Sequence, residues 1–424
     1  MHTHEIDATV EALRDELVAF AQRMVQAASL PNEEHACQAV MAEQLTSMGL
    51  EVAVSPVRFD ALEGHPAFSD DGFSPDARVN VIGRWTGARR DDPTRSLILN
   101  GHVDVVPIGD EALWTVPPFG GVVKDGKLYG RGALDMKSGL AAGVFAIAAL
   151  QRLGFRPAQD VLVESVIGEE SGGVGTLATI VAGHTAGGVI VLEPTRMRMC
   201  PVQSGALTFR LTVEGKAAHA ALRHYGVSAI EKFALILAAI SDLEARRHEN
   251  FSHPLYEDPR HAAPISIGTV HGGEWHSSVP ERVVAEGRFG VLPGESNDAA
   301  RAALESTVRA VAETDPWLRE NPPRVEWFEG QFESGETPAD HPLLQTLAAA
   351  HVDVLGTPPA VEGVPYGSDL RLFTNHARLP AVLYGPGEVS VAHTVDEWID
   401  LEEVVTATKI VAAFITRWVG DAKA

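Results

Sequence analysis

Three apolar segments in the first half of the chain run directly into residues that can bind a metal or transfer a proton. Each is a short apolar run, which indicates a buried strand. The segments and their polar ends are residues 95–103 with His102 and Asp104, residues 161–167 with Glu169 and Glu170, and residues 188–192 with Glu193. Sites in open α/β sheets are built at the carboxyl ends of the strands. The pattern therefore predicts a functional site at one edge of a sheet.

Helical patterns separate these strands and predict how the sheet is built. Residues 139–153 form an alanine-rich stretch that Gly154 would end. Helices between consecutive strands imply a largely parallel sheet that is covered on both faces. The expected fold class is α/β, with a mostly parallel sheet covered by helices.

The periodicity changes at Ala206, where apolar and polar residues begin to alternate as in a half-buried antiparallel strand. The order strand–helix–strand–strand–helix–strand follows, which fits a small two-layer α+β domain. At 424 residues the chain is too long for one ordinary core. We therefore expect a discontinuous larger domain and an inserted one, residues 1–205 with 329–424 and residues 206–328.

The composition narrows the range of partners and locations. A formal net charge of −23 disfavours nucleic acid and anionic membranes, because both require basic surface. The two cysteines, Cys37 and Cys200, fit a reducing compartment and exclude a cysteine-based zinc site. The acidic N-terminal stretch does not have the pattern of a signal peptide, and no apolar run reaches about 18 residues. We expect a cytoplasmic protein with no membrane span.

Each candidate site residue also has an ordinary structural explanation when it is considered alone. His102 and Asp104 lie two apart, so their side chains share one side of a strand end, but such pairs commonly form surface hydrogen bonds. Asp135 follows a glycine-rich approach and could cap the next helix. The doublet Glu169–Glu170 could be a solvated acidic turn. Only convergence at one place would make these residues a site.

The residue types in this set suit a divalent metal centre. Two histidines with several carboxylates and no cysteine favour one or two ions such as zinc, cobalt or manganese. A shared carboxylate can hold two ions about 3.5–4 Å apart and lower the pKa of a bridging water. Adjacent glutamates leave the backbone in different directions, so one of Glu169 and Glu170 can bind metal while the other takes a proton. The candidates are His102, Asp104, Asp135, Glu169, Glu170, Glu193 and His393.

Taken together, the motifs resemble those of one known family. In chain order they are Gly101-His-Val-Asp-Val-Val-Pro107, Gly130-Arg-Gly-Ala-Leu-Asp-Met-Lys-Ser-Gly139, Gly168-Glu-Glu-Ser-Gly172, Glu193-Pro-Thr195, Gly385-Pro-Gly387 and Ala392-His393. The chain resembles the M20 metallopeptidases and deacylases over nearly its whole length. That family includes acetylornithine deacetylase, succinyl-diaminopimelate desuccinylase, aminoacylase-1 and carboxypeptidase G2.

The resemblance implies a division of roles among the candidates. It implies two ion sites that share the carboxylate of Asp135. The ligands of the first ion would be His102, Asp135 and Glu193, and those of the second ion would be Asp135, Glu170 and His393. Asp104 would orient His102. Glu169 would be the general base and would later donate the proton to the leaving amine.

The inserted segment resembles the family's lid and dimerisation domain, which implies a homodimer. His219 matches a histidine that in the family reaches a neighbouring subunit's site and polarises the scissile carbonyl. Arg288 matches an arginine that grips the substrate's carboxylate, a bidentate task that lysine performs poorly.

Three further positions concern the substrate. Ser277 stands where family members often carry asparagine, and Trp275 with His276 adds bulk and a titratable group beside it. Tyr366 begins a Tyr-Gly-Ser-Asp segment that resembles the family's substrate-side loop, although Gly-Ser-Asp is also a plain turn.

The function implied is hydrolysis of the amide of a small N-acyl amino acid, or of a related carboxylate-bearing N-acyl amine, by a binuclear metal-dependent enzyme. Two alternatives stay open. The same metal site could remove an amino group from a small aromatic amine, or the chain could be a catalytically silent relative that binds a ligand or partner.

Overall fold

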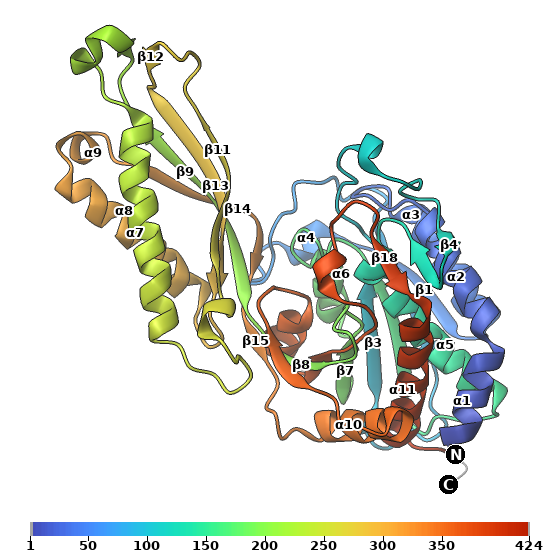
Figure 1. The fold of residues 1–424 in the computed structure, drawn as a ribbon. Helices are drawn as coiled ribbons and strands as arrows, with labels where there is room; N and C mark the ends of the chain where they lie inside the picture. Colours follow the sequence, from blue (N-terminus) through green and yellow to red (C-terminus); the bar gives the residue numbers. More distant parts are fainter. Residues whose placement is uncertain (1–2, 423–424) are drawn as a thin grey trace. The chain divides into compact units, whose positions relative to one another are not determined.

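The computed structural model describes residues 3–422. Its chain forms two compact units (Figure 1). The first unit, here the sheet domain, comprises Met1–Pro201, Glu336–Glu362 and Ser368–Ala424. The second unit, here the inserted domain, comprises Val202–Gly335 and Gly363–Gly367.

These boundaries are wider than residues 206–328, the expected inserted segment. The last strand of the inserted domain, β14, extends from Arg324 to Phe332. Hydrogen bonds join the second piece of this domain, Gly363–Gly367, to its first piece. Gly363 N donates to Leu255 O, and the Tyr256 hydroxyl donates to Val364 O.

The sheet domain is built on one large mixed sheet of nine strands. Its strands, in spatial order, are β1 (Glu51–Pro56), β2 (Val79–Trp85), β6 (Val161–Val166), β3 (Leu97–His102), β7 (Gly188–Val191), β17 (Ala381–Leu383), β8 (Met199–Gln203) and β15 (Gly335–Glu336), with β16 (Val361–Val364) paired to β8. The central strands β6, β3, β7 and β17 are parallel, as predicted. The flanking strands β1, β2 and β8 run antiparallel to their neighbours.

Helices cover both faces of this sheet (Figure 1). They are α1 (Thr3–Ala12), α2 (Arg14–Gln26), α3 (His35–Ser47), α4 (Phe59–Leu62), α5 (Ser138–Arg152), α6 (Val174–Val181), α10 (Pro342–Leu355) and α11 (Leu401–Val419). Two neighbouring residues of β3 show the arrangement. Asn100 bonds to Thr176 on α6, whereas a Cβ on Gly101 would lie 2.8 Å from Leu140 on α5. Since successive strand residues face opposite sides, α5 and α6 lie on opposite faces.

A small three-stranded sheet accompanies this domain, with β18 (Trp398–Asp400), β5 (Lys127–Tyr129) and β4 (Val122–Lys124). The helical stretch Ala133–Arg152, which includes α5, is long and apolar enough to cross a membrane by length and composition alone. However, 89% of its most apolar window is buried among described residues, which is the position of a core helix.

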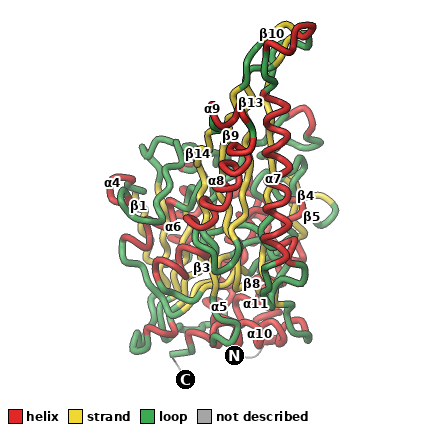
Figure 2. The backbone as a smooth tube through the Cα atoms, turned by 90° about the vertical axis from the view of Figure 1, so that its left-hand side faces the viewer, coloured by secondary structure: helices red, strands yellow, loops and turns green. Residues whose placement is uncertain are grey.

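The inserted domain has the predicted order of elements. It contains β9 (Gly205–Glu214), α7 (Ala229–Glu249), β11 (Ile265–Gly272), β13 (Arg282–Val291), α8 (Asn297–Thr314), α9 (Pro316–Glu320) and β14. The strands form an antiparallel sheet in the order β11-β13-β9-β14. Helices α7 and α8 run along it (Figure 2) and bury an apolar layer that includes Phe209, Phe289 and Leu304. A separate strand pair, β10 (Ala218–His219) with β12 (Ser278–Val279), carries His219.

Candidate metal centre

The seven metal-site candidates all belong to the sheet domain. His102 is the last residue of β3, Glu169 follows the end of β6, and Glu193 follows the end of β7. These strands are parallel neighbours, so their carboxyl ends meet at one edge. Asp135 lies just before α5, and His393 lies in the loop before β18.

Short distances connect the histidines and the carboxylates. His102 Nε2 lies 3.1 Å from Asp135 Oδ1 and 3.9 Å from Glu169 Oε2. His393 Nε2 lies 3.2 Å from Glu170 Oε1 and 3.5 Å from Asp135 Oδ2. Asp135 therefore contacts both histidines, which is the position that a bridging ligand requires.

Two overlapping groups have the spacing of metal ligands. The ligand atoms lie within 4.8 Å of one another in each group, His102 with Asp135 and Glu170, and His102 with Glu169 and Glu193. His102, Glu169 and Glu193 are at most 7% exposed. Clustered carboxylates with so little exposure are costly unless a cation compensates them, so the donor set fits divalent metal.

The main chain orients His102. Its Nδ1 lies 2.9 Å from the main-chain oxygen of Asp104, whereas the Asp104 carboxylate is 3.6 Å away. A carbonyl only accepts, so Nδ1 carries hydrogen, and Nε2, which faces Asp135, is the ring nitrogen that could bind a metal. The Asp104 side chain has another contact, because its Oδ2 accepts from Glu170 N at 3.1 Å. The nearest contact of Asp104 to His102 is thus its carbonyl oxygen, and its carboxylate lies further away.

Glu397 supports Asp135, and sequence reasoning missed it. Its Oε1 accepts from the main-chain nitrogens of Leu134 and Asp135 at 3.0 and 3.2 Å. Its Oε2 forms a buried ion pair with Arg131 at 2.6 Å. The only signal in the sequence was its position four residues after His393.

A buried ion triad supports the Glu169–Glu170 loop and was also missed. Arg78 pairs with Glu34 at 2.8 Å and with Asp71 at 2.6 Å, and all three side chains are at most 2% exposed. Asp71 Oδ2 also accepts from the Ser171 hydroxyl at 3.3 Å. Asp71 therefore anchors Ser171, the residue that follows Glu170.

The surroundings of Glu169, His102 and His393 raise the pKa values of all three side chains. Burial raises the pKa of Glu169 well above its usual range, and the charges of Glu193 and Asp369 add to the effect. Burial alone would lower the pKa of His102, but Asp135 and the other acids outweigh it and raise that pKa. Hydrogen bonds to Asp135 and Glu170 raise the pKa of His393 to about 10. Without metal, His102 and His393 therefore hold their protons more strongly than a free imidazole does.

We predict that metal binding at pH 8 releases about one proton or more, because the metal must displace the proton that His393 holds below pH 10. Calorimetric titration in buffers of different ionisation enthalpy measures this number. A buffer-independent enthalpy would contradict the role of His393 as a ligand.

The remaining candidates lie in the inserted domain. His219 is exposed, and its Nδ1 accepts from Ala221 N, which leaves Nε2 available. The Ser277 hydroxyl lies 2.9 Å from His276 Nδ1, and Tyr366 is half-buried. Arg288 is half-buried and donates to Pro365 O at 2.9 Å. Among the described residues, no carboxylate pairs with Arg288.

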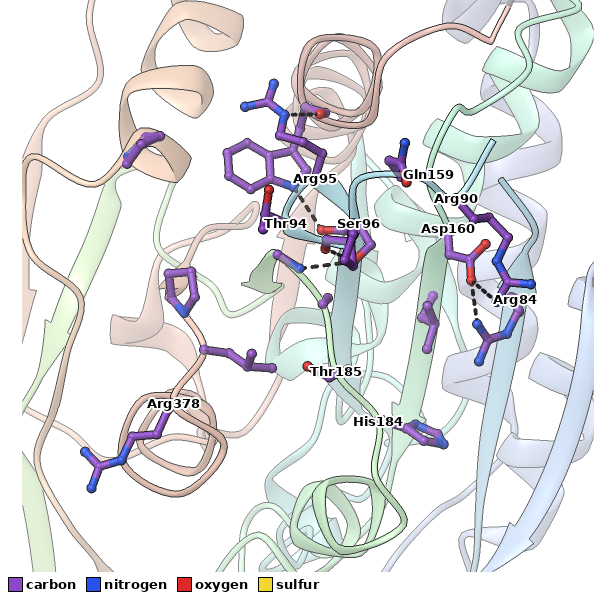
Figure 3. Close-up of a pocket in the computed structure, with 18 of the residues that line it drawn as sticks. Arg84, Arg90, Thr94, Arg95, Ser96, Gln159, Asp160, His184, Thr185 and Arg378 are labelled. Carbon is purple, nitrogen blue, oxygen red and sulfur yellow. Dashed lines mark hydrogen bonds and ion pairs between the residues drawn. The ribbon is translucent and has the colours of Figure 1, made fainter. Parts of the chain in front are cut away.

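A groove of about 740 Å³ in the sheet domain is separate from the metal centre. It lies at the amino ends of β3, β6 and β7 and contains several arginines (Figure 3). Arg84 and Arg90 both pair with Asp160, and Arg95 donates to the carbonyls that end α11. Figure 3 shows Arg378 pointing away from the others. These arginines do not converge, so they do not form one anion-binding centre.

A model of the peptidase family M20/M25/M40 matches residues 98–417. The chain belongs to this family. It is 29% identical to the N-formyl-4-amino-5-aminomethyl-2-methylpyrimidine deformylase of Bacillus subtilis, over 98% of this chain and 97% of that protein. It is 29% identical to the succinyl-diaminopimelate desuccinylase of Roseobacter denitrificans, over 86% of this chain and 94% of that protein. The structure also matches YXEP of Bacillus subtilis, described as a dinuclear metal-binding M20 peptidase, with a TM-score of 0.63, 16% identity and coverage of 96% and 99%.

Membership confirms the resemblance and the fold class drawn from the sequence. This protein is a metal-dependent hydrolase that acts on amide C–N bonds, in a family that uses divalent metals and hydrolyses N-acyl compounds.

Proposed function

We propose that this hydrolase removes a small acyl group from the nitrogen of a small organic amine. The observation that carries the proposal is the convergence of buried Glu169 with the complete set of metal-site candidates at one sheet edge. A silent binding relative would have no need of a buried proton-transfer carboxylate beside the ligands.

Glu169 performs the proton transfers of this reaction. A divalent ion at the site supplies Lewis-acid activation of water and carbonyl. Glu169 takes one proton from the attacking water, whose oxygen bonds to the carbonyl carbon. As the C–N bond breaks, Glu169 passes that proton to the leaving nitrogen. Its raised pKa suits the second step, since the carboxyl group holds the proton until the nitrogen accepts it.

Two observations bear on the substrate class. The similarity to the pyrimidine deformylase spans nearly the whole of both chains, which makes an N-formyl aminomethylpyrimidine the first compound to test. Arg288 is half-buried with a lowered pKa caused by burial, and among the described residues no acid neutralises it. A substrate carboxylate would do so, which favours N-acyl amino acids as the second class.

Product analysis by mass spectrometry tests the proposal. Metal-loaded protein is offered N-formyl aminomethylpyrimidines, N-acetyl and N-succinyl amino acids, and aminobenzoates. Free amine with carboxylic acid, abolished by chelator, supports deacylation and names the substrate class. Ammonia released from the aromatic compounds would instead establish a deaminase.

We predict that His219→Ala lowers kcat by about 10²-fold or more, because the imidazole donates a hydrogen bond to the developing oxyanion. Metal content should stay at the wild-type level, since His219 is not among the ligands. His224→Ala, on the same exposed turn, is the control. Loss of metal from His219→Ala would contradict the assignment.

We further propose zinc as the native metal, with cobalt or manganese as substitutes, and a homodimer formed through the inserted domain. Both cysteines, Cys37 and Cys200, are free and buried, which supports a cytoplasmic location. Metal analysis of protein purified without added metal, and sedimentation at several concentrations, test the first two points.

A further inference from the structure

A chain of buried polar side chains runs through the sheet domain from the side of the Glu169 loop to the opposite edge of the sheet. Its members are Asp369, Thr176, Asn100, Glu164 and His184. The first four are at most 1% exposed, and His184 lines the groove of Figure 3. None of the five belongs to the metal-site candidates. The hydrogen bonds that link these side chains lie in the core, where a polar group that loses its partner is costly.

The hydrogen bonds of this chain have a defined direction. Asn100 Nδ2 donates to Glu164 Oε2 at 3.4 Å and to Thr176 Oγ1 at 3.0 Å. His184 Nδ1 lies 2.8 Å from the other oxygen of Glu164. Because Thr176 accepts from Asn100, its own hydroxyl proton is directed to Asp369 Oδ2, 2.6 Å away. Thr176 therefore holds Asp369 in one orientation.

Asp369 in turn lies against the Glu169 loop, the segment that joins β6 to α6. A Cβ on Gly173 would be 2.5 Å from Asp369 Oδ1, so the carboxylate abuts the loop backbone where no side chain intervenes. Arg371, two residues further on, donates to Gly172 O at 2.8 Å. The charge of Asp369 also acts on Glu169, whose pKa it helps to raise. The Glu169 loop is thus held from the α6 side by groups outside the set of metal-site candidates.

We propose that Thr176 is a positioning residue for Glu169. It acts through Asp369. The hydrogen bond from Asn100 Nδ2, which Glu164 also accepts, fixes the direction of the Thr176 hydroxyl. The proposal rests on the function proposed for Glu169, because that carboxylate must sit within hydrogen-bond reach of the attacking water. Displacement by about 1 Å is enough to cost a large factor in rate.

Three variants test the hydroxyl. Thr176→Val keeps the shape of the side chain but removes the hydrogen bond to Asp369 Oδ2 and one of the two acceptors of Asn100 Nδ2. We expect kcat to fall about 10–100-fold. KM should change by less than about threefold, since substrate binding is not the interaction removed. Thr176→Ser keeps the hydroxyl and should restore kcat to within about threefold. The control is Thr408→Val, which removes an equally buried hydroxyl that bonds only within α11.

Hydrogen exchange provides a readout that does not depend on activity. Peptides that cover residues 167–177 should exchange faster in Thr176→Val than in wild-type protein or Thr408→Val, with metal content unchanged. Thr176→Ala removes the same hydroxyl and replaces the valine variant if that variant does not fold.

The outcomes separate this proposal from the role of Glu169. Wild-type exchange and kcat in Thr176→Val, failure of Thr176→Ser to restore kcat, or loss of metal from Thr176→Val would each overturn positioning by Thr176. If Glu169→Gln keeps full turnover while Thr176→Val still loosens the loop, the role of Glu169 is wrong and the structural coupling stands.

Discussion

Glu169→Gln is expected to lower kcat by about 10³-fold, the middle of the range for loss of a general acid–base group. The glutamine amide has nearly the same shape but cannot accept a proton from water or return it to the leaving nitrogen. Glu169 is 7% exposed, so a solvent molecule cannot easily take over its proton transfers. Steady-state kinetics with the best substrate of the panel measures the loss.

Metal content separates a base from a ligand at this position. Glu169 shares one of the two metal-like groups with His102 and Glu193, so the metal-free geometry also permits it to bind an ion. If Glu169→Gln keeps both ions and loses turnover, it is the base. If the Glu169→Gln variant loses an ion as well as turnover, Glu169 is a metal ligand and its proposed role as the base is wrong. Glu51→Gln, at an exposed position on β1, is the control for the substitution itself.

Asp135→Asn is expected to weaken metal binding by more than about 100-fold and to abolish turnover, since loss of a direct ligand exceeds the loss seen for supporting groups. Asp135 is the one carboxylate within 3.5 Å of both histidines among the described residues. Its pKa is lowered because the two histidines outweigh its burial, so the oxygens are ionised and ready to bind metal. Elemental analysis after dialysis measures the number of ions per chain.

The same variant tests whether the carboxylate bridges. If Asp135 holds two ions, both should be lost together, whereas retention of one ion would show that it serves a single site. Chelation of the wild-type protein should also lower Tm, because metal binds the folded state in preference to the unfolded chain. Asp125→Asn, in the exposed turn between β4 and β5, is the matched control.

The periodicity of the chain was sufficient to predict the parallel core of the sheet domain, the order of elements in the inserted domain and the sheet edge where the metal-site candidates converge. Apolar runs such as residues 161–167 specify buried strands locally, and the order of elements limits how such strands can be connected. Parallel strands present their carboxyl ends at one edge of a sheet. The convergence of His102, Glu169 and Glu193 therefore follows from the sequence pattern alone.

The contacts that support the site depend on tertiary structure alone. Glu397 meets the backbone of Asp135, Asp71 meets Ser171, and Thr176 meets Asp369, across separations of 262, 100 and 193 residues. The contact of His102 Nδ1 with the carbonyl oxygen of Asp104 is of the same kind. Hydrophobic periodicity indicates which face of a helix or strand is buried, but it does not indicate which distant loop covers that face. Only the folded chain, in which each buried polar group must find a partner, decides these pairings.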